Sequence, residues 1–562
     1  MPKSSIRTLS LLFPYVFNIL RAAAAVVIGI AELTPVHQPQ EGIYHVGCQL
    51  GAGDLPDDGN HLIEVHAVAI GAVGIHRVKA IRHGDDLGHA GNFIPLQMVG
   101  ISLSDVVSRG KRLEASVFDV EAKHARAVVE NGKYPIKRIS GPDGFTSAYV
   151  CGRFKRIWVE KSGLPIYQPS SIVDVYPTPD GYISHKTKTD IDALRVHQGQ
   201  VLMTCSGTIG KLAYVSKTLD NKIFSHDLLR INCNNPDDAG YIYAYLKSNV
   251  GNKILLTNSY GAVITHIEPE HLVTVPVPDA PDEIKKRINN LVIRSYELRD
   301  ESNARIDEAT ALLIEELELP AIRDFNLMLY KKDTNVDTFS VKLGHLEGRI
   351  DASFHVPAVD AIIAHLKQHA AEVTTVGNTR VSTEIILPGR FKRVYVEEGY
   401  GRVFIGGKQI FELDPTNKKY LSLVHHGDRI AKQLELHEGM TLITCSGTIG
   451  KVALVGKQWE KWTANQHIIR IVPANKEIAG YLYIFLASEY GHALITHYTY
   501  GSVVDEIDDT HVSSIPFPVL KNADVQRRIN ELALEASEKR FEAYRLEQQA
   551  LRIVNDEILF AK

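Results

Sequence analysis

The sequence has few cysteines and no excess of positive charge. No two of its five cysteines form a C-x-x-C pair or another spacing typical of a metal site, so we expect free thiols in a reducing compartment, the cytoplasm, and no metal. The formal net charge of −4 over 562 residues is mild evidence against a protein that binds nucleic acid by itself, because such proteins usually carry a basic surface. Locally clustered basic residues are still compatible with this composition.

The sequence also lacks recognisable catalytic motifs. It contains no Asn/Asp-Pro-Pro-Tyr/Phe loop of an amino-methyltransferase, no helicase motif and no Ser/His/Asp constellation. The segment 207–211 differs from a phosphate-binding loop, because only two residues separate its glycines and Leu212 stands where a hydroxyl is needed. We therefore predict that the chain is not an enzyme and holds no cofactor of its own.

Residues 1–105 have no counterpart elsewhere in the chain. The apolar run 9–31 is typical of a signal peptide, but Asn18 and Arg21 interrupt it and make it a poor membrane-spanning helix. The histidines of this region lack the spacing of a metal site. Two interpretations stay open: a small extra domain, which would also be where an enzyme's active site could lie, or a translated extension upstream of the true start.

The rest of the chain contains one unit twice. The heptad Cys-Ser-Gly-Thr-Ile-Gly-Lys occupies 205–211 and recurs without change at 445–451. Such self-similarity at a long period indicates a duplicated unit. The similarity extends outward from the heptad, so that 112–320 aligns with 349–560. We therefore expect the function to be something that is done twice.

The two copies differ in limited segments. Residues 165–196 have little in common with 402–436, and the tripeptide 225–227 is replaced by an unrelated one at 465–467. A shared scaffold with divergent surface segments is what we expect of two binding heads that each read something different.

Within each copy, short β-branched and aromatic segments alternate with Gly, Pro, Asn and Asp, which predicts a mixed α/β domain with substantial strand. The heptad joins two such segments, 201–204 and 212–215, as the turn of a hairpin. Glycine is needed there because it adopts positive φ without strain. The four structural glycines of the two turns are Gly207, Gly210, Gly447 and Gly450.

Each copy ends in a long helix. The stretches 281–320 and 522–560 carry apolar residues at roughly heptad spacing. We predict an α+β fold in which domains at 111–278 and 348–518 are joined by two antiparallel coiled-coil helices, each with an apolar seam too narrow to be buried in a domain core. About 35 residues at ~1.5 Å each give a rod of roughly 50 Å. The residues predicted for helix packing or partner docking are Ile284, Ile288, Leu291, Leu298, Val525, Ile529, Leu532 and Leu546.

This ordered combination resembles the specificity subunit of type I restriction–modification enzymes. The resemblance covers about 110–562 and rests on the twice-used Ser-Gly-Thr-Ile-Gly-Lys, on Tyr-Gly followed by Pro-x-Pro, and on a long helix after each copy. It implies two target-recognition domains that each read half of a split site in double-stranded DNA. The helices would set the spacing and dock methyltransferase subunits, and motor/nuclease subunits would join afterwards.

The resemblance also implies that S-adenosylmethionine, ATP and Mg belong to those partner subunits, and that no membrane is involved. Residues 1–105 depart from the family, whose members usually begin near the first recognition domain. A second functional class stays open, in which the chain is a scaffold or adaptor that grips two protein partners through its similar heads and reads no DNA.

The densest basic clusters that include an aromatic residue lie at matching positions of the two copies. Because both copies share them, we expect the clusters to contact DNA phosphates rather than bases, while the divergent segments read sequence. The alternative for the clusters is a solvated strand edge without a ligand. The alternative for the two heptad lysines is a plain hairpin turn. The candidate DNA-binding residues are Arg153, Lys155, Arg156, Lys211, Arg390, Lys392, Arg393 and Lys451.

Overall fold

The structure is a computed structural model that describes residues 65–70, 75–80, 100–101, 118–159, 161–260, 265–322, 324, 339–346, 348–501 and 503–561. Most of the segment 1–105 lies outside these residues, so neither interpretation of it is tested. The part of it that is described consists of three strands paired in the order β1-β2-β3, namely β1 (Val65–Ile70), β2 (Ile75–Ala80) and β3 (Gly100–Ile101). We use head 1 for the described residues of 118–280, head 2 for those of 348–521, and rod for the two long helices.

Head 1 contains two four-stranded sheets and a two-stranded ribbon. The inner sheet has the order β10-β9-β12-β5 and is antiparallel throughout. The outer sheet has the order β11-β7-β8-β6, with β11 parallel to β7, and the ribbon pairs β4 with β13. The strands are β4 (Ile136–Arg138), β5 (Thr146–Tyr149), β6 (Trp158–Val159), β7 (Leu164–Tyr167), β8 (Gly181–Ile183), β9 (Val201–Thr204), β10 (Leu212–Tyr214), β11 (Ile223–Phe224), β12 (Leu228–Cys233) and β13 (Pro276–Pro278).

Head 2 repeats this topology strand for strand. Its inner sheet is β20-β19-β22-β15, its outer sheet is β21-β17-β18-β16 with β21 parallel to β17, and its ribbon pairs β14 with β23. The duplication found in the sequence is therefore also present in the fold. The strands are β14 (Glu372–Thr375), β15 (Ser382–Ile386), β16 (Tyr395–Val396), β17 (Gly401–Ile405), β18 (Lys419–Ser422), β19 (Thr441–Thr444), β20 (Val452–Leu454), β21 (Thr463–Ala464), β22 (Ile468–Pro473) and β23 (Pro516–Val519).

In each head a helix packs against the inner sheet, α4 in head 1 and α11 in head 2, and the mixed α+β fold class is confirmed. The exception to the symmetry is α10, which lies in a segment where the two copies diverge. The helices of head 1 are α3 (Val120–Glu130), α4 (Ala239–Lys247), α5 (Asn249–Leu256) and α6 (Pro269–Leu272); those of head 2 are α9 (Pro357–His369), α10 (Leu423–Arg429), α11 (Lys476–Ala487), α12 (Glu489–Thr496) and α13 (Asp509–Ser514).

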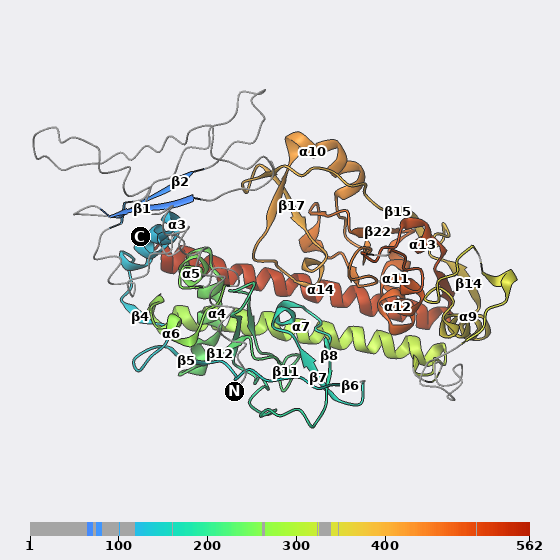
Figure 1. The fold of residues 1–562 in the computed structure, drawn as a ribbon, viewed down its shortest axis with the longest axis horizontal. Helices are drawn as coiled ribbons and strands as arrows, with labels where there is room; N and C mark the ends of the chain where they lie inside the picture. The colour runs from blue at the N-terminus through green and yellow to red at the C-terminus, as the bar shows by residue number, and fades with distance from the viewer. Residues whose placement is uncertain are drawn as a thin grey trace, which may run out of the picture. The chain divides into compact units, whose positions relative to one another are not determined.

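The rod consists of α7 (Asp282–Glu316) and α14 (Ala523–Ile553), which continues as a π-helical turn, Val554–Leu559. The two helices lie side by side (Figure 1). They are antiparallel, because Arg287 near the start of α7 pairs with Glu557 beyond the end of α14 at 2.9 Å, whereas Glu316 at the end of α7 accepts from the amide of Asn522, the N-cap of α14, at 3.1 Å.

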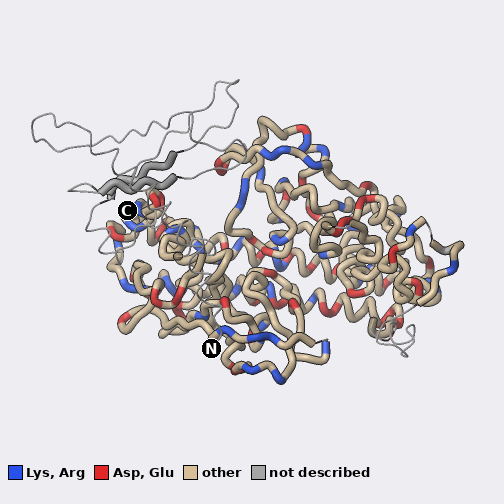
Figure 2. Tube along the Cα trace, viewed as in Figure 1, with Lys and Arg blue, Asp and Glu red and all other residues tan. Residues whose placement is uncertain are grey.

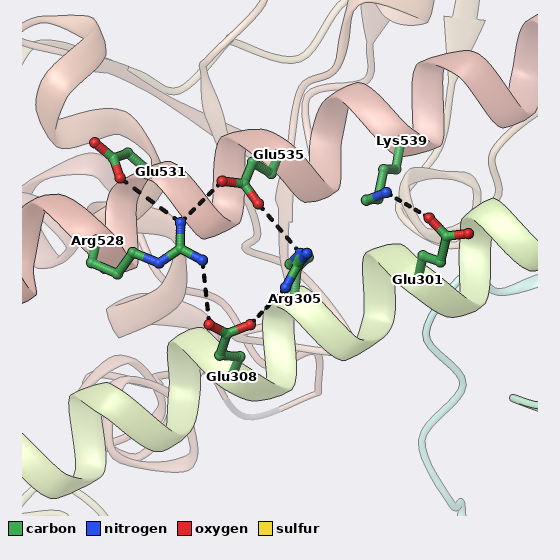
Figure 3. Close-up of polar contacts among 7 residues, drawn as sticks. All are labelled: Glu301, Arg305, Glu308, Arg528, Glu531, Glu535 and Lys539. Carbon is green, nitrogen blue, oxygen red and sulfur yellow. Dashed lines mark hydrogen bonds and ion pairs between the residues drawn. The ribbon is translucent and has the colours of Figure 1, made fainter.

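A ladder of ion pairs crosses the middle of the rod. Arg305 and Glu308 of α7 alternate with Arg528 and Glu535 of α14, with nitrogen–oxygen distances of 2.9–3.3 Å. Figure 3 shows the chain of contacts passing from one helix to the other. Each of these side chains is about 40% exposed, so each pair adds little stability by itself. Together the pairs join the two helices in the register that the structure has.

The ends of the rod lie inside the heads, which corrects the prediction of a seam too narrow to enter a domain core. Ile288 belongs to the core of head 1 together with Ile553 from the far end of α14. Ile529 and Leu532 belong to the core of head 2 together with Leu313 of α7. Each head is thus packed against both helices, and this burial stabilises the rod and the heads as one unit.

The residues predicted for packing or docking therefore divide into two groups. Ile288, Ile529 and Leu532 are fully buried within the chain, and Leu298 is nearly so in the middle of the rod. These four side chains are not accessible to a partner. The other four are half-buried at the margins of the cores, namely Ile284, Leu291, Val525 and Leu546.

The same polar contact joins each head to the rod. The amide of Gly240 in α4 donates to Oδ1 of buried Asn289 in α7 at 2.7 Å, and Gly480 in α11 donates to Asn530 in α14 at the same distance. A Cβ atom at either glycine would lie 2.4–2.7 Å from the backbone of that asparagine. Glycine is therefore required for the close approach of helix to helix.

Candidate nucleic-acid interface

The shared heptad forms the turn between two antiparallel strands of each inner sheet, with Met203 paired to Leu212 in head 1. Its glycines have φ values of +70° and +81° in head 1 and +76° and +78° in head 2. Positive φ favours glycine because in other residues the Cβ atom comes too close to the following carbonyl oxygen. At Gly450 space is limiting as well, since an added Cβ would lie 2.8 Å from His492. The turn glycines are Gly207, Gly210, Gly447 and Gly450.

A second shared segment, Tyr-Gly and the residues after it, is hydrogen-bonded to this turn. In head 1 the amide of Gly207 donates to Thr265 O at 3.0 Å, and the amide of Ile267 donates to Cys205 O at 2.9 Å. Head 2 repeats both bonds, at 2.9 and 3.0 Å, between Gly447 and Asp505 and between Ile507 and Cys445. The turn and the Tyr-Gly segment therefore form one rigid edge in each head.

The basic clusters alternate between exposed and half-buried side chains. In head 1, Arg153 and Lys155 are exposed, whereas Phe154 and Arg156 are half-buried, and the phenyl ring packs edge-on against His226 with the centroids 5.9 Å apart. The aromatic residue anchors the segment while alternate cations face solvent. Head 2 repeats the pattern, with Arg390 and Lys392 exposed and Phe391 and Arg393 half-buried. Figure 2 shows further lysine and arginine along the outer sheets of both heads.

In head 2 the basic cluster contacts the tripeptide that differs between the copies. Arg393 donates to Oε1 of Gln466 at 2.7 Å. Burial lowers the pKa of His467, and the nearby charges of Arg393 and Arg390 lower it further. The neutral imidazole is therefore favoured, and its Nε2 lies 3.0 Å from Nε2 of Gln466, with which it forms a hydrogen bond.

In head 1 the matching tripeptide lies in the same surroundings. Burial lowers the pKa of His226, and the charge of Asp227 raises it. The charges of Arg156 and Arg153 lower the pKa further. The structure thus brings the shared cations together with residues in which the copies differ. This juxtaposition is the arrangement that a surface reading two different DNA sequences requires.

The helix α10 adds a feature to head 2 that head 1 lacks. It contains no buried residue, and Val424 is 90% exposed. The guanidinium of Arg429 lies over the ring of Phe391, 4.9 Å from its centroid, and donates to Gly389 O at 3.2 Å. The helix is thereby fixed on the basic cluster, on the side of head 2 away from the rod (Figure 1). Sequence reasoning placed this segment among the divergent ones but did not identify a helix in it.

The two heptad lysines have different surroundings. Nζ of Lys211 lies 2.5 Å from Oε1 of Glu412 in head 2, and the two side chains are only 18% and 5% exposed. Lys211 is therefore committed to an ion pair between the heads, which does not fit its prediction as a phosphate ligand. Lys451 is exposed.

The ion pair of Lys211 is part of a direct contact between the heads that sequence reasoning missed. The amide of Val175 in head 1 donates to Phe411 O in head 2 at 2.9 Å, and Asp174 faces Glu412 as an isolated antiparallel bridge. Burial and the Glu412 charge raise the pKa of Asp174 to about 7, against the opposing charge of Lys211. Both acids lie just after short 3-10 turns, but in segments whose sequences do not align.

Two features are absent from the part of the chain that the structure describes. No group of three or more His, Cys, Asp or Glu residues is arranged to hold a metal ion. None of the helices combines the length and the apolar character that a membrane crossing requires.

Comparison with known proteins gives a family for part of head 2 and of α14. Residues 412–532 match the type I restriction modification DNA specificity domain. No curated protein matches the chain. Solved structures similar to it include the S subunit of a type I restriction–modification system from M. genitalium (13% identity, 76% of this chain and 96% of that one, TM-score 0.27) and the HsdS subunit from Thermoanaerobacter tengcongensis (15%, 74% and 98%, TM-score 0.23).

Proposed function

We propose that this chain is a specificity subunit of a type I restriction–modification system and reads DNA with both heads. Its residues 412–532 match the DNA specificity domain of that class. Head 1 and head 2 are its two target-recognition domains, and each contacts one half of a bipartite site in double-stranded DNA. The shared cations hold the phosphates, and the neighbouring divergent residues contact base edges in the groove.

The alternating exposure of the two basic clusters carries this proposal. Arg153 and Lys155 in head 1, and Arg390 and Lys392 in head 2, extend from a segment that a half-buried phenylalanine anchors. Phosphate contacts need such cations at fixed positions, because they set the register of a protein on the duplex without reading sequence. The overall charge of −4 is no obstacle, since the cations are gathered at matching points of the two heads.

The rod and the contact between the heads set the spacing of the two half-sites. The ion-pair ladder fixes the register of α7 against α14, and Lys211 with Glu412 ties head 1 to head 2. Because each head also packs on both helices, a change in the rod moves one reader relative to the other. The distance between the readers is then a built-in property of the chain.

The chain acts in the cytoplasm as a non-catalytic subunit. Methyltransferase subunits dock on it, motor/nuclease subunits join that complex, and S-adenosylmethionine, ATP and Mg act on those partners. The half-buried rod residues at the margins of the cores, such as Leu291 and Leu546, are candidates for part of this docking surface, because their exposed portions are apolar.

The proposal is tested by the salt dependence of DNA binding. The full chain is co-purified with its methyltransferase subunits, and its affinity for DNA is measured over a range of salt concentrations. Lys155→Ala with Lys392→Ala should weaken binding to all sequences about equally and reduce the slope of log affinity against log salt by about two, since each phosphate contact contributes ~0.9.

The matched control is Lys367→Ala with Lys476→Ala, which removes two exposed lysines outside the basic clusters. The control should leave the slope unchanged. If both double variants change the slope equally, or if neither does, the basic clusters are not the phosphate-binding surface.

A further inference from the structure

One position differs in charge between the heads although its backbone is held in the same way. His266 exchanges two backbone hydrogen bonds with Tyr260, at 2.9 and 2.7 Å. Glu506 exchanges the same two bonds with Tyr500, at 3.0 and 2.8 Å. Both residues lie in the segment that follows the shared Tyr-Gly.

The same two residues are also held from their other side. His266 forms an antiparallel bridge with Ser206 in the heptad turn, and Glu506 forms one with Ser446. Because the backbone is paired on both sides, the Cα–Cβ direction is fixed against the scaffold of each head. The chemistry of the side chain is then what distinguishes the two positions. Both side chains are half-buried, so each retains a face toward solvent.

The position lies beside the basic cluster. Oε1 of Glu506 accepts from Nη2 of Arg390 at 3.1 Å, and the arginine is 81% exposed. In head 1, hydrogen bonding to Glu268 raises the pKa of Tyr260, and the charge of Arg153 opposes that shift. The ring of Tyr260 packs against that of His266, with the centroids 5.9 Å apart. In head 2, therefore, the divergent side chain adjoins the shared arginine, and in head 1 it packs against the ring of the shared tyrosine.

A carboxylate is an unexpected group on a surface that meets phosphates, because it repels them. It becomes favourable where it accepts a hydrogen bond from a base, and the major groove offers such a donor in the N4 amino group of cytosine. An imidazole carries one donor and one acceptor, or two donors when protonated, so it can donate to the N7 or O6 acceptors of guanine. The two heads would then discriminate different bases at equivalent points.

We propose that His266 and Glu506 are specificity-determining residues that each read one base of their own half-site, with Glu506 selecting cytosine through its N4 amino group. This inference rests on the proposed DNA-reading function and names positions within it. Arg390 holds the carboxylate ready in the absence of DNA and is itself free to turn to a phosphate when DNA is bound.

The test is to map the sites that the complex methylates, using the full chain with its methyltransferase subunits. Glu506→His should change the preferred base at one position of one half-site by about tenfold to a hundredfold, the usual effect of one mismatched pair. His266→Glu should change one position of the other half-site. Glu506→Met retains nearly the size of the side chain but has no oxygen acceptor, and should lose the preference for cytosine even if histidine prevents folding.

Asp509→Asn is the matched control, because it removes an exposed carboxylate three residues away in the first turn of α13. It should leave the methylated motif unchanged. The inference is wrong if the Glu506 variants keep the motif of the wild type, or if they weaken binding equally on all sequences. Failure of the wild-type complex to prefer any sequence would instead contradict the proposed function itself.

Discussion

Replacing Glu547 by glutamine should destabilise the protein by several kcal/mol, because this side chain neutralises two buried cations. Glu547 lies in α14 and is 1% exposed. Its carboxylate lies 2.9 Å from Nζ of Lys247 in α4 and 3.0 Å from Nη2 of Arg299 in α7, and it accepts a hydrogen bond from the hydroxyl of Tyr243. The cluster therefore joins head 1 to both helices of the rod.

Removing one partner of a buried ion pair leaves an uncompensated buried charge, which costs about 3–5 kcal/mol. Burial by itself would raise the pKa of Glu547, but Lys247 and Arg299 outweigh it and lower the pKa from 4.5 to about 2. A difference of that size corresponds to about 3 kcal/mol.

The assay is equilibrium unfolding in urea at neutral pH, with Glu538→Gln as the control. Glu538 also pairs with a lysine, Lys457, but both side chains are largely exposed, so the control should lose no more than about 1 kcal/mol. Replacing Glu547, Lys247 and Arg299 together by leucine should recover much of the stability, because no charge is then left buried. Equal urea midpoints for the two glutamine variants would refute the reasoning.

The remaining predictions concern pH and the heptad turn. The pKa of Glu547 is depressed, so its contribution is complete above pH 4.5 and is lost as the pH falls toward 2; acid titration of unfolding should show this loss in the wild type and not in Glu547→Gln. The pKa of Asp174 is raised from 3.8 to about 7, so stability should fall as the pH rises between those values, and Asp174→Asn should remove that decline in thermal unfolding. Gly450→Ala should lower stability by more than the ~1–2 kcal/mol of left-handed strain alone, because the added Cβ would lie 2.8 Å from the ring of His492. Gly447→Ala, which meets no atom within 4 Å, should cost only the strain; equal losses would refute the steric argument.

The features that could be predicted from the sequence are those that depend on neighbouring residues. The hairpin around Gly207 follows from β-branched segments on either side of two glycines. The starts and ends of α7 and α14 follow from prolines, a capping asparagine and apolar spacing. The duplication was visible because the heptad is identical in both copies.

Contacts between distant residues could not be predicted in this way. Glu547 and Lys247 are 300 residues apart, and an acid and a base at that separation give no periodic signal. The contact between the heads pairs Asp174 with Glu412, in segments whose alignment fails. The heptad pattern predicted that the helices would pair, but the burial of their ends in the heads depends on the shape of those cores. For the same reason Lys211 could not be distinguished from Lys451 by sequence.

The central claim is that two readers on one rod recognise two half-sites at a spacing set by the chain. Its most direct test is to insert one heptad into each rod helix, beside Asn303 in α7 and Ser537 in α14, and to map the sites that the complex methylates. Seven residues lengthen a helix by about 10 Å and keep nearly the same face toward its partner. The account predicts the same two half-site sequences, separated by about three more base pairs, since base pairs are ~3.4 Å apart. Unchanged spacing, or altered half-site sequences, would contradict it.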